Sequence, residues 1–497
     1  MLALTLSLAL GPLLFFGSAL IVASAGYVVY QCFFSPIAAF PGPFAAKFTK
    51  IWRAYATYRG QWHREIMELH RRYGNVVRIG PNELSVGDPQ AFRTIYRVNG
   101  AFVKSACYAV LQGSRPFDLT GERNEKIHSA QRRLVARPYS MESVAHLEPQ
   151  VTHLIGDLLI KFDSFAASSR PIDIGTWFQL FAFDVIGAIS FSKPFGFVAL
   201  ANDDGILTRI ERSLGNTAWL MHVPWLFNFH QKYILPVFGN FLRANDRNDY
   251  FFNFAKSEVQ GRRDKGGIDN DLVGQLFQAA HSKMELNDLV ISFMMTSNVF
   301  AGSDTTSAAL RGIFLNLLRH PRVLSKLRAE LEEQRAAGHL SSIVTFQEAE
   351  ASPYLQAVMH EAMRVFSPVG FNPDRDVPKE GMMINGIFVP GGTVVGSNAW
   401  VIHRVPEVWG ADFEQFRPER WLERESSSEL KRFFFAFGGG TRTCIGKNIS
   451  WLEIGKLVAT LVMRYDFELV DDANITESCS GLVFMKGLKV KLKTREA

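Results

Sequence analysis

The sequence is poor in cysteine and has no long run of lysine or arginine. Four of the 497 residues are cysteines, Cys32, Cys107, Cys444 and Cys479. Their spacing matches neither a disulfide framework nor a zinc site, so we expect the folded part to lie in a reducing compartment. The formal net charge is +6. Without a basic run, this charge argues against nucleic-acid binding and fits an anionic membrane or an acidic protein partner better.

Charged side chains are also missing from the first 46 residues. The segment from Leu2 to Tyr30 is overwhelmingly apolar and long enough for a helix to cross a hydrocarbon core of about 30 Å. It lacks the basic start and the short apolar core of a cleaved signal peptide. Basic residues follow the segment and none precedes it, which favours a cytosolic location for the rest of the chain. We therefore predict a single-pass transmembrane anchor over residues 1–34.

No repeat or low-complexity linker divides the chain after the anchor. Residues 35–46 contain Pro36, Pro41 and Pro43, which predict a stiff hinge. Residues 47–497 are then expected to form one large domain. Periodicity predicts a helix over Gln61–Tyr73, two strands within Val76–Val86, mostly helices from about 143 to 340, and strands again near 382–389 and 482–492. The expected fold class is mainly α, with a smaller β-rich lobe.

The most informative stretch reads FAFGGGTRTCIGKN, residues 435–448. Its glycines allow the backbone to turn tightly and to approach a flat ligand closely. Cys444 precedes a predicted helix, whose N-terminus favours the thiolate form of a cysteine. Arg442 supplies a fixed positive charge suited to an acidic group of the ligand. This combination fits haem iron and its propionates; a structural cysteine in a tight turn is the alternative.

This stretch resembles the haem-binding signature of the cytochrome P-450 superfamily, which falls on Phe437, Gly440, Arg442, Cys444 and Gly446. The resemblance implies the cytochrome P-450 fold, preceded here by the anchor, and haem b with an axial thiolate. It makes Cys444 the iron ligand and the other four residues cofactor-binding.

This resemblance also points to three further basic residues. His128 and Arg132 are four residues apart, on one face of a predicted helix. In the family, residues at this spacing bind a haem propionate, and Arg375 matches a further propionate-binding arginine. Taken alone, the first pair is equally well explained as part of a solvated basic face.

A long predicted helix contains the stretch Phe300–Thr306, which reads FAGSDTT. Glycine weakens a helix, and the Thr305 hydroxyl can compete for a backbone carbonyl, so the helix can open locally beside a small ligand. The stretch matches the oxygen-activation motif of the family, which implies that Asp304 and Thr305 form the catalytic proton-relay pair. The alternative is a bent helix with a satisfied threonine.

Glu361 and Arg364 are three residues apart on a predicted helix and can form an ion pair. In isolation this is a common surface pattern. The resemblance implies that both residues join Arg420, from the Pro418–Trp421 segment, in a buried structural network that holds the cysteine loop. Trp421 departs from the usual phenylalanine of the family.

The resemblance implies a haem-thiolate monooxygenase of the microsomal fungal type, similar to the pisatin-demethylase-like branch. Such an enzyme hydroxylates or O-demethylates a lipophilic small molecule in secondary metabolism or detoxification. Its electrons come from NADPH–cytochrome P-450 reductase, with cytochrome b5 as an optional donor, at the cytosolic face of the endoplasmic reticulum membrane. The alternatives are a haem-thiolate isomerase or dehydratase and a haem sensor without turnover.

The resemblance also predicts which stretches line the substrate pocket. These stretches are Phe102–Phe117, Ala218–Phe238, Ser297–Thr305, Pro368–Asn372 and Gly481–Phe484. Their aromatic residues are expected to make the pocket apolar: Tyr108, Phe117, Trp219, Phe300, Phe371 and Phe484.

Overall fold

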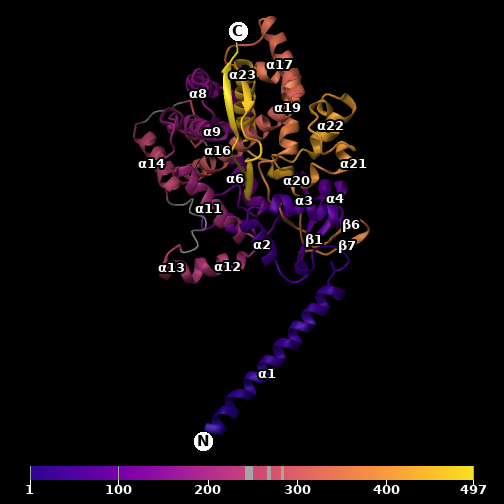
Figure 1. The fold of residues 1–497 in the computed structure, drawn as a ribbon. Coiled ribbons are helices and arrows are strands. Elements are labelled where there is room, and N and C mark those ends of the chain that lie inside the picture. The colour runs from indigo at the N-terminus through magenta and orange to yellow at the C-terminus, as the bar shows by residue number, and fades with distance from the viewer. Residues whose placement is uncertain (1, 99, 241–249, 266–269, 281–284, 496–497) are drawn as a thin grey trace.

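The computed structural model describes residues 2–98, 100–240, 250–265, 270–280 and 285–495. One helix projects from a body made mainly of helices (Figure 1). This helix is α1 (Leu2–Val29), which continues into a π-helical turn at Tyr30–Phe34. Residues Phe15–Phe34 are long and apolar enough to cross a membrane and are almost unburied. The apolar N-terminal segment therefore forms a helix, as predicted.

The β-rich lobe contains a mixed five-stranded sheet in the order β1-β2-β8-β5-β3. Its strands are β1 (Val76–Gly80), β2 (Glu83–Val86), β3 (Val103–Lys104), β5 (Arg375–Asp376) and β8 (Val394–Gly396). A separate hairpin pairs β6 (Met382–Ile384) with β7 (Ile387–Val389). Three helices accompany the sheet: α2 (Ile51–Tyr58), α3 (Trp62–Tyr73) and α4 (Pro89–Ile95). The strands and helix predicted here are confirmed.

The helical lobe is built around five long helices. They are α8 (Glu148–Ser168), α9 (Ile174–Phe191), α16 (Asp288–Arg319), α19 (Pro353–Val365) and α23 (Lys447–Arg464). Helix α9 is apolar enough to resemble a membrane span, but it is 89% buried. It packs along α16, the longest of the five, and both contribute to the main hydrophobic core. Such burial identifies α9 as a core helix.

Further helices complete this lobe and its connections. Those before α16 are α5 (Tyr108–Gln112), α6 (Glu125–Val135), α7 (Met141–Ala145), α10 (Phe197–Leu200), α11 (Ile206–Leu220), α12 (Pro224–Phe229), α13 (Leu235–Phe238), α14 (Tyr250–Lys265) and α15 (Leu272–Ala280). Those after it are α17 (Pro321–Ala336), α18 (Phe346–Glu350), α20 (Ala399–Ile402), α21 (Pro406–Trp409) and α22 (Arg424–Phe433).

The remaining strands join distant parts of the chain. A three-stranded sheet has the order β4-β12-β9 and unites β4 (Ile172–Asp173), β9 (Tyr465–Leu469) and β12 (Lys489–Thr494). The last hairpin pairs β10 (Thr476–Ser480) with β11 (Leu482–Lys486). A bridge between Val369 and Leu482 ties this hairpin to the segment after α19. The turn of the hairpin thereby reaches the cavity described next.

Candidate active site

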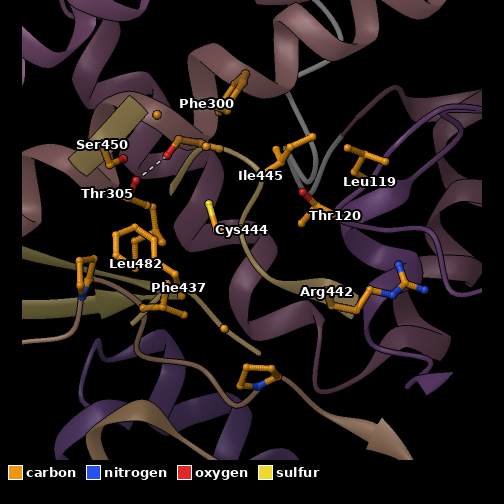
Figure 2. Close-up of a pocket in the computed structure, with 18 of the residues that line it drawn as sticks. Leu119, Thr120, Phe300, Thr305, Phe437, Arg442, Cys444, Ile445, Ser450 and Leu482 are labelled. Atoms are coloured by element: carbon orange, nitrogen blue, oxygen red, sulfur yellow. Dashed lines mark hydrogen bonds between the residues drawn. The ribbon is translucent and has the colours of Figure 1, made fainter. Parts of the chain in front are cut away.

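A cavity of about 390 Å³ lies between α16, the loop before α23 and the β-rich lobe. All five predicted stretches contribute to its wall. Figure 2 shows Cys444 in the centre, with Phe300 and Thr305 from α16 on one side and Arg442 on the other. The wall is mostly apolar, as expected for a small-molecule site.

Three of the six aromatic residues expected in the wall are present: Tyr108, Phe300 and Phe371. The prediction was wrong for Phe117, Trp219 and Phe484. Phe117 and Phe484 are instead buried in the interior, and Trp219 packs on a small cluster around Leu220. Whether a side chain points toward a cavity or away from it depends on the exact turn of its element, which composition alone does not determine.

The loop before α23 carries Cys444 on a tightly folded backbone. Gly440 has a φ of +63°, and a Cβ at this position would lie 2.5 Å from the carbonyl oxygen of Tyr96. Gly440 thus shapes the loop from behind, while Gly438, Gly446 and Phe437 line the cavity. The Cys444 amide donates to the Phe437 carbonyl over 2.9 Å, which fixes the cysteine at the cavity wall.

The Cys444 side chain is accessible because it faces the cavity, yet many protein atoms surround the thiol. This enclosure raises the pKa of the thiol, although backbone N–H groups of Gly446 and Lys447 and the positive charge of Arg132 act in the opposite direction. The helix N-terminus alone was expected to favour the thiolate. The cost of burying the charge outweighs that effect and keeps the pKa of the thiol raised.

Basic side chains gather on one side of the same cavity: Lys104, His128, Arg132, Arg375 and Arg442. Arg442 pairs with Glu125 over 2.6 Å. Burial and the charges of Arg442 and Arg375 hold the pKa of Lys104 well below its ordinary value. Burial and the same Arg442 charge lower the pKa of His128 to about 3. The basic groups thus repel one another and would be stabilised by a bound anion.

This arrangement fits a flat, anionic, metal-bearing prosthetic group. Among the described residues, no group of three or more histidine, cysteine or acidic side chains could hold a metal ion. A metal at Cys444 therefore needs its other ligands from the group that carries it. The clustered cations fit acidic substituents of that group, and the bare Gly446, whose Cβ would have only the Cys444 sulfur at 4.0 Å, leaves room for its plane.

On the opposite wall, α16 runs unbroken through the Phe300–Thr306 stretch. The Thr305 hydroxyl donates to the Ala301 carbonyl over 2.7 Å and lines the cavity. The hydroxyl therefore contacts a backbone carbonyl as predicted, but the expected local opening of the helix is wrong, because the helix is continuous through this stretch. Its oxygen can still accept a hydrogen bond from a molecule in the cavity.

Asp304 lies on the other side of α16, buried and outside the cavity wall. Its Oδ1 accepts from Gln179 of α9 over 2.8 Å. Burial raises the pKa of this carboxyl to about 6, while the Gln179 amide and the Arg311 charge act in the opposite direction. The structure thus brings Thr305, but not Asp304, together with Cys444 in the cavity.

The Glu361 carboxylate forms the centre of a buried network behind the loop. It accepts from Arg364 over 2.8 and 2.9 Å and from Arg420 over 3.0 Å. The Trp421 indole donates to it over 2.8 Å, a bond that phenylalanine could not form. The three charged residues are all fully or almost fully buried.

Two charged residues of the wall were not singled out from the sequence, although Lys104 lies within the predicted stretch Phe102–Phe117. Lys104 is directly opposite Arg375 in the pairing of β3 with β5, so the register brings both cations to the cavity. Glu453 of α23 lines the cavity, and burial raises its pKa well above the ordinary value. No local sequence pattern marks either residue. Lys104 could have been identified only from the pairing of β3 with β5, which places it opposite Arg375.

Fold and site together define a protein that binds a planar metal group through one thiol and faces it with an apolar cavity. The Cytochrome P-450 family model matches residues 41–493. The chain therefore belongs to the cytochrome P-450 family, whose members bind haem through a cysteine thiolate. It is a haem-thiolate monooxygenase.

Several fungal proteins are similar over most of their length. The cytochrome P-450 monooxygenase hepC of Aspergillus oryzae is 52% identical over 92% of this chain and 93% of its own. A cytochrome P-450 monooxygenase of Aspergillus terreus is 35% identical over 86% and 90%. Pisatin demethylase of Fusarium vanettenii is 33% identical over 89% and 86%. These names give no support to the isomerase or sensor alternatives.

Proposed function

We propose that this enzyme hydroxylates or O-demethylates a lipophilic small molecule in fungal secondary metabolism or detoxification. The observation that carries the proposal is the presence of the Cys444 thiol and the Thr305 hydroxyl on facing parts of one apolar cavity. The fungal relatives support a role in fungal secondary metabolism or detoxification, and one of them is named as a demethylase. NADPH–cytochrome P-450 reductase is the proposed electron donor, with cytochrome b5 as an optional second donor.

In this proposal Cys444 is the iron ligand. His128, Arg132, Arg375 and Arg442 bind the acidic substituents of haem, together with Lys104, which shares their side of the cavity. Phe437 and Gly446, which line the cavity, would lie beside the group, and Gly440 sets the turn that presents the cysteine. When bound, haem supplies the iron that activates oxygen, and its thiolate ligand favours O–O cleavage.

Protons are proposed to reach the cavity around α16, since Asp304 lies on the side of this helix that faces away from the cavity. Asp304 has a pKa of about 6, close enough to neutrality for it to take up and release a proton readily. Thr305 is the next residue and faces the cavity, where its hydroxyl can hold a water molecule. We therefore assign the delivery of protons to Asp304 and their final orientation to Thr305.

Replacing Thr305 with alanine should uncouple electron flow from product formation. The variant should load haem and consume NADPH, but the ratio of hydrogen peroxide formed to NADPH consumed should rise several-fold, because the water is no longer held in place. Both quantities can be measured in membranes reconstituted with the reductase. Thr306→Val is the matched control, since the Thr306 hydroxyl lies 3.1 Å from that of Ser450. An unchanged ratio in Thr305→Ala and in the double variant Thr305→Ala with Thr306→Ala would contradict the assignment.

We also propose that the enzyme is anchored in the endoplasmic reticulum membrane by α1, with the catalytic domain in the cytosol. Residues 1–34 then form the anchor, 35–46 the hinge and 47–497 the monooxygenase domain. Helices α2, α12 and α13 lie at the end of the body from which α1 departs (Figure 1). Their exposed side chains Tyr58, Trp225 and Phe238 suit a membrane–water interface.

Deleting residues 2–28 should weaken membrane attachment of the protein without loss of haem. The cut preserves Gln31, whose side-chain and backbone oxygens accept from the buried Arg78 guanidinium over 2.5 and 3.0 Å. Deleting residues 2–34 removes that partner and should lower the melting temperature by several degrees. Membrane flotation and haem content provide the measurements. Loss of haem in the shorter deletion would show that α1 belongs to the catalytic fold.

A further inference from the structure

A second, smaller chamber adjoins the main cavity. Its volume is about 20 Å³, just above the roughly 10–15 Å³ that one water-sized group requires. Ala218, Met221, Phe371 and Gly481 line both spaces. The two spaces therefore adjoin and share part of their wall, and the chamber has room for one small substituent but not for a ring.

Most of the chamber wall is apolar, as in the main cavity, but polar side chains also contribute to it. Arg53, Thr57, His222 and Asp374 line it, and all four are buried. The His222 Nε2 and the Thr57 hydroxyl are 2.8 Å apart and form a hydrogen bond. Burial, with the nearby charges of Arg53 and Lys50, holds the pKa of His222 well below its ordinary value. The imidazole is therefore neutral and, with the hydroxyl, offers both a donor and an acceptor.

Charges around the chamber are balanced within the protein. Arg53 lies 3.0 Å from Glu83 and 3.3 Å from Asp374, and Lys50 pairs with Glu83. An ionised guest would enter without a counter-charge, which is costly at a buried site. Among the described residues, none offers a hydrogen-bond partner to Nε of Arg53 or Oδ1 of Asp374. The chamber therefore suits a neutral group with hydrogen-bonding capacity.

We propose that this chamber binds a neutral hydroxyl or carbonyl oxygen of the substrate, whose apolar body occupies the main cavity. The inference rests on the proposed function, because it concerns the same substrate. It narrows the substrate class to an oxygen-bearing lipophilic molecule rather than a hydrocarbon, a carboxylate or an amine. The oxygen at His222 and Thr57 anchors one end, and this anchoring determines which carbon lies near Cys444.

Three probes with one apolar body test the proposal: 2-ethylnaphthalene, 2-(2-naphthyl)ethanol and 2-naphthylacetate. Each is titrated into the full-length, haem-loaded protein in phospholipid nanodiscs, and the spin-state change of the haem band reports binding. The alcohol should bind about tenfold more tightly than the hydrocarbon and the carboxylate, as one or two neutral hydrogen bonds would give. Thr57→Val and the double variant with His222→Phe should remove this preference and leave hydrocarbon binding unchanged.

His230→Phe serves as the matched control, because His230 is a buried histidine of the same region that lines neither space. Equal affinities of the wild-type protein for alcohol and hydrocarbon, including a lack of binding by both, would overturn the proposal. A preference that survives in Thr57→Val and in the double variant would do the same. Haem content distinguishes a failure of this proposal from a failure of the proposed function. If the proposed function is wrong, the wild-type protein should not bind haem at all.

Discussion

Replacing Cys444 with serine is expected to abolish the red-shifted Soret band of the reduced carbon monoxide complex. The serine hydroxyl occupies nearly the same space but is a far weaker metal ligand, so the loop keeps its fold and loses the ligand alone. Substitutions of outer-shell partners typically cost about 10–100-fold in metal affinity or activity. Removing the ligand itself should therefore reduce monooxygenase activity by more than about a hundredfold.

Cys107→Ser is the matched control for this variant. Cys107 is also largely enclosed, but it lines only the small second chamber, next to the Ser105 hydroxyl at 3.1 Å. Haem content and the carbon monoxide spectrum should both be normal in this control. An unchanged Soret band in Cys444→Ser would refute the assignment, because the cavity wall contains no other cysteine.

Much of the fold could be predicted because its signals are local. The strands of residues 76–86 flank a Gly-Pro-Asn turn, and α4 begins where Asp88 accepts from the Ala91 amide. These features depend on neighbouring residues, as helix caps and turns do. The short strands β3 and β5 were not predicted, since two residues carry no periodicity and their pairing depends on chain segments that are far apart.

The residues of the candidate site also divide into those that local sequence predicts and those that depend on tertiary packing. The glycines, Arg442 and Cys444 occur within one short stretch, so their cooperation was predictable. The orientation of Asp304 was not, because Asp304 and Thr305 are adjacent on a helix and adjacent side chains point in directions about 100° apart. Its contact with Gln179 depends on how α9 packs against α16. Lys104 and Glu453 likewise enter the wall only through tertiary packing.

Replacing Glu361 with alanine is expected to prevent accumulation of the haem-loaded protein. The carboxylate accepts five hydrogen bonds, one of them from the Arg417 amide over 3.0 Å. Its loss leaves Arg364 and Arg420 buried without their shared counter-charge. Breaking a buried pair in this way costs about 3–5 kcal/mol, a large part of the roughly 5–15 kcal/mol by which a typical domain is stable.

The loss of Glu361 should displace the cysteine loop through His403. His403 Nδ1 lies 3.0 Å from the Arg364 carbonyl oxygen, and its Nε2 accepts from the Phe435 amide over 2.8 Å. This pattern fixes the tautomer with the proton on Nδ1. Phe435 is the first residue of the loop that carries Cys444, so a shift of Arg364 also shifts the loop. We therefore expect Glu361→Ala to lose haem as well as thermal stability.

Trp421→Phe provides a graded comparison for the same network. It removes the indole hydrogen bond to Glu361 but keeps the ring and both ion pairs, so it should cost only about 1 kcal/mol and retain haem. Thermal melting and haem content should follow the order wild type, Trp421→Phe, Glu361→Ala. A Glu361→Ala protein with normal haem content and melting temperature but no turnover would contradict the structural role, because a residue that only maintains the loop cannot affect the reaction without affecting the loop.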